Sequence, residues 1–145
     1  MKNIQGDAFI FDLFYDRLSK VEPVSERTPI FRNIHLSNVT GNDIKRIGYI
    51  KGIEEMPISE LSFSNMNIVA GKGFQAETAT DIRFNNVSFT VEEGPSLNIR
   101  QCKDIFLNDV RSKQPLIGQP VVNIEKDTEN VTVIHCDSTL IVRKQ

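Results

Sequence analysis

The stretch "DIRFNNVSF" at residues 81–89 has a close copy 48 residues earlier, "NIHLSNVTG" at residues 33–41, and looser copies on either side. The copies are "NIHLSNV" from Asn33, "ELSFSNM" from Glu60, "DIRFNNV" from Asp81, "DIFLNDV" from Asp104 and "NVTVIHC" from Asn130. Successive copies begin 27, 21, 23 and 26 residues apart. A repeat with a period of 20–50 residues predicts a solenoid, in which each unit stacks on the next.

Apolar residues occupy the second, fourth and seventh places of each copy, as Ile82, Phe84 and Val87 do in the third one. The first two alternate with polar residues, which is the spacing of a β-strand with one buried face. We therefore expect Phe84 to point into the core and Arg83 to point to solvent.

The sixth place of the copies is mostly filled by Asn or Asp. Its occupants are Asn38, Asn65, Asn86, Asp109 and His135. Stacked side-chain amides can hydrogen-bond to one another from unit to unit, so we expect an amide ladder at a buried corner that ends after Asn86. The alternative is that Asn is present only because it tolerates turn geometry.

A second short strand follows most copies, with Gly or Pro just before it. The segments are "GFQAE" (73–77), "PSLNIRQ" (95–101) and "QPVVNIEK" (119–126). Glycines 48, 73, 94 and 118 mark corners that need a positive φ or a close backbone approach. Each unit therefore holds at least two strands and a corner.

These observations predict an all-β fold, a right-handed parallel β-helix of about five to six rungs that forms a single domain over residues 1–145. A leucine-rich repeat has a similar period, but it needs Leu at fixed places and Leu is scarce here. Residues 16–29 are polar, contain two prolines and predict a loop insertion that either lines a binding face or is merely solvated. The chain begins in mid-repeat, so the first rung is expected to be uncapped, with open strand edges.

Composition excludes several classes of function. Charged residues make up 25% of the chain and the net charge is −2, so there is no basic surface of the kind that binds nucleic acid. No apolar run is long enough to cross a membrane, and "MKNIQGDAFIFDLF" lacks the features of a signal peptide. Cys102 and Cys136 have no paired spacing, which favours buried free thiols over a disulfide or a metal site. We expect no cofactor.

The segments "NIQGDAFIFDLFYD", "TPIFRNIHLSNVTG", "EMPISELSFSNMNI" and "GFQAETATDIRFNNVSF" resemble the C-terminal half of glycoside hydrolase family 28, the polygalacturonase-type pectin hydrolases. The resemblance covers essentially the whole chain. It implies a right-handed parallel β-helix and hydrolysis of galacturonan with inversion. It also implies that a full-length relative is secreted or periplasmic.

The four catalytic motifs of that family, Asn-Thr-Asp, Asp-Asp, Gly-His-Gly and Arg-Ile-Lys, are all missing from this sequence. By resemblance, Tyr15 matches a tyrosine of the family's substrate cleft and would contact the sugar. The alternative is a tyrosine that closes a strand beside the loop. Arg17, in the same loop, is a weaker candidate for contact with an acidic sugar.

Other acids and bases form no catalytic set in the sequence. Glu77 and Glu125 are expected two rungs apart with Arg100 between them, pairing with both, which is typical of a surface charge ladder rather than of the acid and base of an inverting hydrolase. His35 and His135 lie in different repeats and in no nucleophile motif. Asp12 lies in an apolar strand and either faces a cleft or holds the loop.

Two hypotheses follow. In the first, the chain is the C-terminal β-helix portion of a pectin hydrolase, catalytically incomplete by itself, with galacturonan or another acidic polysaccharide as its partner. In the second, it is a stand-alone non-catalytic module for polysaccharide binding or self-assembly, with homo-oligomers formed through the open N-terminal rung. What precedes the sequence in the genome distinguishes the two.

Overall fold

The computed structural model describes residues 1–14, 23–26 and 28–144. In these ranges the protein is all-β, and all its paired strands are parallel. The strands are β1 (Lys2–Asp12), β2 (Arg32–Lys51), β3 (Ile58–Arg111), β4 (Val122–Ile124), β5 (Glu129–Ile134) and β6 (Ile141–Arg143). The helical content of the described residues is one 3-10 turn, η1 (Ser138–Leu140). The sequence-based prediction of parallel β structure is confirmed.

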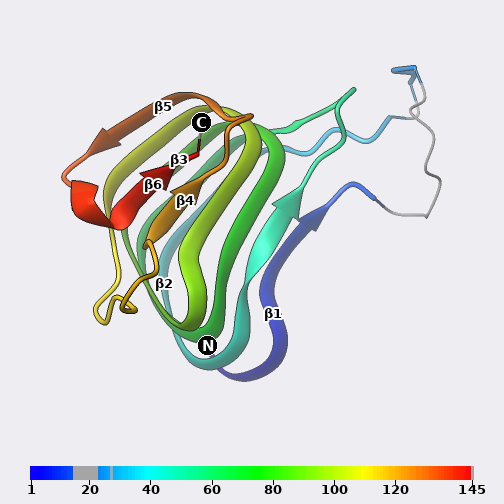
Figure 1. Cartoon of the computed structure of the whole chain (residues 1–145). Helices are drawn as coiled ribbons and strands as arrows, with labels where there is room; N and C mark the ends of the chain where they lie inside the picture. Colours follow the sequence, from blue (N-terminus) through cyan, green and yellow to red (C-terminus); the bar gives the residue numbers. More distant parts are fainter. Residues whose placement is uncertain (15–22, 27, 145) are drawn as a thin grey trace.

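The sheet order is β1-β2-β3-β4-β6, with β5 beside β3 (Figure 1). β1 pairs with the second half of β2, from Lys2↔Asn42 to Asp12↔Lys51. β2 pairs along its length with β3, from Arg32↔Ser59 to Lys51↔Glu77. The later part of β3 pairs with β5 through Ile105↔Val131 and with β4 through Leu97↔Val122.

β3 is a bent strand. Its 54 residues would extend to about 180 Å at about 3.3 Å per residue if they were straight. Instead, Figure 1 shows the ribbon of β3 curving round repeatedly, so that segments of one strand lie side by side. Phe63 stacks on Phe84, 21 residues further along β3, with ring centroids 4.9 Å apart. The chain therefore returns onto itself with the period seen in the sequence.

The bends occur at residues with left-handed backbone conformation, which explains the repeated places. The first residues of the five copies, Asn33, Glu60, Asp81, Asp104 and Asn130, have φ between 49° and 59°. The sixth-place residues Asn38, Asn65, Asn86, Asp109 and His135 have φ between 52° and 57°. Asn and Asp reach this region at lower cost than other non-glycine residues. Each copy is thus a short extended segment between two corners.

The sixth-place ladder exists, but it is exposed. Asn65 donates to Oδ1 of Asn38 at 3.4 Å, and Asn86 donates to Oδ1 of Asn65 at 2.8 Å. The next sixth-place residue, Asp109, has no side-chain N–H to donate. Arg111 donates to Oδ1 of Asn86 instead, at 3.2 Å. The predicted end after Asn86 is confirmed. The predicted burial is wrong, because the left-handed corner turns these side chains outward.

The core fills the space inside the bends, and its largest members are aromatic. Phe63, Phe74, Phe84 and Phe89 are each at most 1% exposed. Phe74 meets Phe63 edge-on with centroids 5.2 Å apart, the arrangement that aromatic pairs favour. Arg83 is exposed, so the predicted inward and outward assignment of this stretch is confirmed.

Two glycines show why the corners need that residue. Gly94 has φ +71°. At Gly73, a Cβ would lie 2.2 Å from the carbonyl oxygen of Pro95, so neighbouring segments could not approach as closely with any other residue. Gly73 and Pro95 both line the cleft described next.

Candidate functional site

The outward side chains of β1, β2, β3 and β4 form one continuous surface, called here the cleft face. The strand registers place Tyr49 of β2 beside Gln75 of β3, and Asn98 of β3 beside Asn123 of β4. Arg100 donates to Glu77 at 2.7 Å, which brings the Asn98 segment beside the Gln75 segment. The result is an outward row of one tyrosine and three amides.

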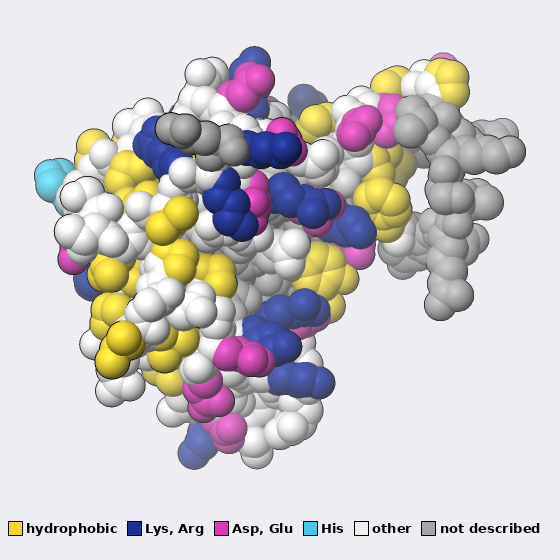
Figure 2. Space-filling model, in the orientation of Figure 1, with side chains coloured by type: hydrophobic (Ala, Val, Ile, Leu, Met, Phe, Trp, Pro, Cys, Tyr) yellow, Lys and Arg dark blue, Asp and Glu magenta, His cyan; other side chains and the backbone are white. Residues whose placement is uncertain are grey.

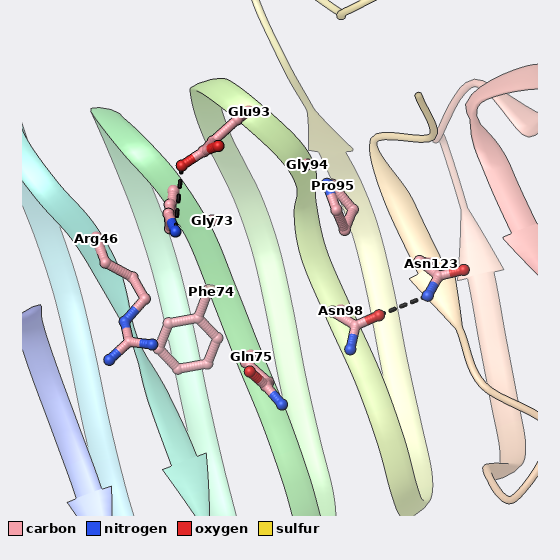
Figure 3. Close-up of a pocket in the computed structure, with 10 residues that line it drawn as sticks. Arg46, Gly73, Phe74, Gln75, Glu93, Gly94, Pro95, Asn98 and Asn123 are labelled. Carbon is pink, nitrogen blue, oxygen red and sulfur yellow. Dashed lines mark hydrogen bonds and ion pairs between the residues drawn. The ribbon is translucent and has the colours of Figure 1, made fainter. Parts of the chain in front are cut away.

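A cleft of about 470 Å³ lies on this face (Figure 3). Its lining residues are Arg46, Lys72, Gly73, Phe74, Gln75, Glu93, Gly94, Pro95, Asn98 and Asn123. Asn123 donates to Oδ1 of Asn98 at 2.5 Å and to Oε1 of Glu125 at 2.8 Å, which fixes both amides on the cleft wall. Lys72 pairs with Glu93 at 3.2 Å across the rim.

Arg46 enters the cleft from β2 and is held by Asp7 of β1. Its Nε and Nη2 atoms both donate to the Asp7 carboxylate, the second at 2.7 Å. This hydrogen bonding raises the pKa of Arg46 above its ordinary value. The Arg46 guanidinium carbon also lies 5.1 Å from the centre of the Tyr49 ring, within range of a cation–π contact. Arg46 is therefore a fixed cation between two parts of the face.

A second hollow, of about 460 Å³, adjoins Tyr49 on the β1 side. It is lined by Ile10, Asp12, Phe14, Phe31 and Tyr49. Ile10 is 54%, Phe14 is 49% and Phe31 is 36% exposed, so three large apolar side chains gather in one open patch. The ammonium of Lys51 lies 4.6 Å from the centre of the Phe14 ring. The hollow is an aromatic platform with one carboxylate.

The role of Asp12 is now clear. Its Oδ1 accepts from the backbone N–H of Phe14 at 2.7 Å, and its Oδ2 accepts from the hydroxyl of Tyr49 at 3.1 Å. Burial and this hydrogen bond raise the pKa of Tyr49, so the phenol stays neutral and donates. Asp12 thus both lines the hollow and holds the chain where it leaves β1.

The predicted charge ladder is present and longer than expected. Its members alternate in sign along one outward row, called here the charge column: Asp12, Lys51, Glu77, Arg100, Glu125 and Lys144. Acidic and basic side chains lie close together across the face seen in Figure 2. The prediction that Arg100 pairs with both glutamates is wrong in part. Arg100 bonds Glu77, whereas Glu125 takes Lys144 at 3.0 Å.

Lys144, the partner of Glu125, also changes its ionisation. Its hydrogen bond is the largest cause that lowers the pKa of Glu125, and Asn123 and the more distant Arg100 act in the same direction. The structure aligns "GYIK" at 48–51 with "FQAE" at 74–77, so that Lys51 stands beside Glu77. The second strands predicted from the sequence start at residue 73, so the predicted ladder does not include Lys51.

His35 has a serine neighbour that the sequence did not reveal. Its Nδ1 lies 2.6 Å from Oγ of Ser62, and its Nε2 lies 2.8 Å from Oδ1 of Asn33. Ser62 comes from the next repeat, 27 residues on. The order resembles a nucleophile, a base and an orienting group, but His35 and Asn33 are exposed, and water there weakens the electrostatic stabilisation that such a site needs.

Other reactive groups give no site in the part of the chain that the structure describes. Cys102 is free and buried, and burial raises the pKa of its thiol to about 11, so it is a poor nucleophile. Cys136 is free and partly buried. Among the described residues no three His, Cys, Asp or Glu side chains cluster as metal ligands. The same residues include no helix that is long and apolar enough to span a membrane.

The sequence-predicted site residues Tyr15 and Arg17 lie outside the described residues, as do 16–22 and 27 of the predicted loop. The tyrosine that the structure places on the cleft face is Tyr49. The chain matches no protein-family model, no curated protein and no solved structure.

Proposed function

We propose that the chain folds as a right-handed parallel β-helix of five to six rungs, and that its cleft face binds an acidic polysaccharide of the galacturonan type. The fold proposal is supported by the parallel registers and by the two left-handed corners in each repeat. Right-handedness follows from the strong preference of parallel crossover connections. The missing catalytic motifs and the resemblance to polygalacturonase-type hydrolases support the proposal of a non-hydrolysing portion of such a β-helix.

The observation that carries the binding proposal is the Arg46 cleft. A guanidinium has five N–H groups. Among the described residues Arg46 uses two of them on Asp7, which leaves three for a ligand carboxylate. Lys72 and Glu93 have side chains that are 58% and 64% exposed, so their ion pair is weak and Lys72 can exchange partners with little loss.

The neighbouring groups match the rest of a uronic acid residue. The amides of Gln75 and Asn98 offer donors and acceptors to sugar hydroxyls. The rings of Tyr49 and Phe14 offer flat apolar surface to the C–H face of a sugar. Because the two hollows adjoin at Arg46 and Tyr49, a chain of several sugars could lie across both.

Titration with oligogalacturonate, followed by NMR or calorimetry, tests the proposal. Lys72→Ala should weaken binding about two- to tenfold, the range expected for one exposed cation. Lys103→Ala is a matched control, because Lys103 is 56% exposed, pairs with Glu129 and lies away from the cleft. A methyl-esterified oligomer should bind more weakly than the acid.

Equal effects of the two lysine substitutions would contradict the proposal, since they would show a general charge effect and not a site. Equal binding of the acid and its methyl ester would contradict the assignment of an acidic ligand.

A further inference from the structure

The two ends of the strand stack are complementary to each other. Among the described residues β1 pairs only with β2, and β6 pairs only with β4, so each keeps one edge without a strand partner. The same holds in the other half of the stack, for the strand segments of the repeat copies. Among the described residues, residues 32–37 of β2 pair only with β3, and β5 pairs only with β3, so each also keeps one edge without a strand partner. Free edges of parallel strands are templates for another strand.

We propose that this chain assembles head to tail with a second copy of itself, β6 and β5 of one copy pairing in parallel with β1 and β2 of the next. The rows of the stack fix the register. The row through Tyr49, Gln75, Asn98 and Asn123 begins with Ile10 and ends with Val142. A second copy that continues this row therefore sets its Ile10 beside Val142.

Charge complementarity supports this partner over others. The charge column ends with Lys144, whose ammonium already bonds Glu125, and begins with Asp12. Continuing the column would set Lys144 of one copy beside Asp12 of the next and keep the alternation of sign. Each Asp12 oxygen accepts one hydrogen bond from the described residues and has capacity for another.

A second charge pair arises independently in the other half of the stack. The row there begins with Arg32 beside Ser59 and ends with Lys103 beside Glu129. The stacking of Phe63 on Phe84 and the bond from Asn108 to Asn85 connect these two pairs into one row. Glu129 already has Lys103 on one side at 3.9 Å. Arg32 of the next copy would meet it on the other.

Apolar surface at the two ends matches as well. Val142 is 42% and Ile10 is 54% exposed, and both belong to the same outward row. The inward residues of the end strands are only partly buried: Phe9, Phe11, Ile34 and Leu36 at one end, Val131, Val133 and Ile141 at the other. Stacking would cover this apolar surface and extend the core. Because the contact joins unlike ends, it generates an open file of copies unless a rotation closes it.

Charge reversal tests the arrangement through sedimentation velocity over a wide concentration range. The wild-type chain should associate reversibly. Glu129→Arg and Arg32→Glu should each raise the dissociation constant about tenfold or more, because each sets like charges at the junction. An equimolar mixture of the two variants should recover association, since every junction between unlike variants pairs opposite charges. Circular dichroism checks that each variant keeps its β structure.

Thiol cross-linking is the second readout, and it holds even if a charge reversal prevents folding. A mixture of Ile10→Cys and Val142→Cys chains should form a disulfide-linked dimer, because neighbouring strand positions satisfy disulfide geometry. Gln75→Cys replaces Ile10→Cys in the control mixture. Gln75 is also outward but lies within the stack, so this mixture should give no more dimer than the wild type.

Three results would overturn the proposal: a wild-type chain that stays monomeric at its highest soluble concentration, association that neither charge reversal changes, and variant mixtures that fail to associate. Oligogalacturonate binding is measured separately on monomer, so failure of the assembly leaves the binding proposal unaffected.

Discussion

At the scale of single residues, Phe84 is the clearest test of the core. It is fully buried, stacks on Phe63 and meets Phe74 edge-on with centroids 6.0 Å apart. Neighbouring segments enclose it on both sides along the stack, so a cavity there cannot collapse onto solvent. Phe84→Ala should lower the free energy of unfolding by about 3–5 kcal/mol in chemical denaturation.

The adjacent residue supplies the control. Arg83 is exposed, and its bond to Asp81 at 3.2 Å joins two exposed side chains. Arg83→Ala should therefore cost less than about 0.5 kcal/mol. Similar losses for the two variants would show that the inward and outward assignment of this strand is wrong.

A property of a single residue could be predicted from the sequence where it depends only on neighbouring residues in the chain. Alternation identified Phe84 and Arg83 correctly because neighbouring strand residues point to opposite faces. The pairing of His35 with Ser62 was missed, because it joins residues 27 apart and depends on the register of two repeats. The sequence shows that the first-place residues are Asn, Asp and Glu, but the repeat pattern does not predict their left-handed backbone conformation.

At the scale of the elements, the corners make a sharper prediction than the strands. Asn65 has φ 53° and is bonded to both Asn38 and Asn86. Asn65→Gly loses the amide bonds but keeps easy access to the left-handed region, whereas Asn65→Ala loses both. In thermal or chemical denaturation Asn65→Ala should be the less stable variant by about 1 kcal/mol. Equal stability would mean that the ladder, and not the backbone conformation, selects Asn here.

The charge column predicts a dependence of stability on acid. Lys144 lowers the pKa of Glu125 below its ordinary value of 4.5, so the folded protein favours the ionised form. The stabilisation is complete above pH 4.5 and is lost as the pH falls through the lower folded value. As the pH falls below 4.5, the free energy of unfolding should decrease more steeply in the wild type than in Glu125→Gln.

Lys144→Gln should remove most of the same pH dependence, because it deletes the chief cause of the shift. If the free energy of unfolding had the same dependence on pH below 4.5 in the wild type and in both variants, the ion pair would contribute nothing to stability. Sequence reasoning placed Glu125 on the correct face but gave it Arg100 as a partner. The actual partner follows β6, a three-residue strand whose register the repeat pattern did not fix.

At the scale of the whole molecule, parallel β structure could be predicted because the repeat is written five times in the sequence. The cleft could not, since its lining residues come from separate segments of β2, β3 and β4 that only the three-dimensional register brings together. Tyr49 shows the difference. The resemblance implies a sugar contact for Tyr15, which lies outside the described residues, whereas Tyr49 joins the two hollows through Arg46 and Asp12.

The chain alone should release no reducing ends from polygalacturonate. An inverting hydrolase needs one protonated and one ionised carboxyl group, roughly 6.5–9.5 Å apart and free to act on the bond. On the cleft face Glu77 bonds Arg100 at 2.7 Å, Glu125 bonds Lys144 at 3.0 Å, and Asp12 accepts hydrogen bonds from Tyr49 and Phe14. A reducing-end assay on purified protein measures this, beside a Glu77→Gln/Glu125→Gln double variant. Turnover in the wild type that disappears in the double variant would make the charge column an active site. Equal background in both is the expected result, because Glu77 and Glu125 are each bonded to a cation of the column.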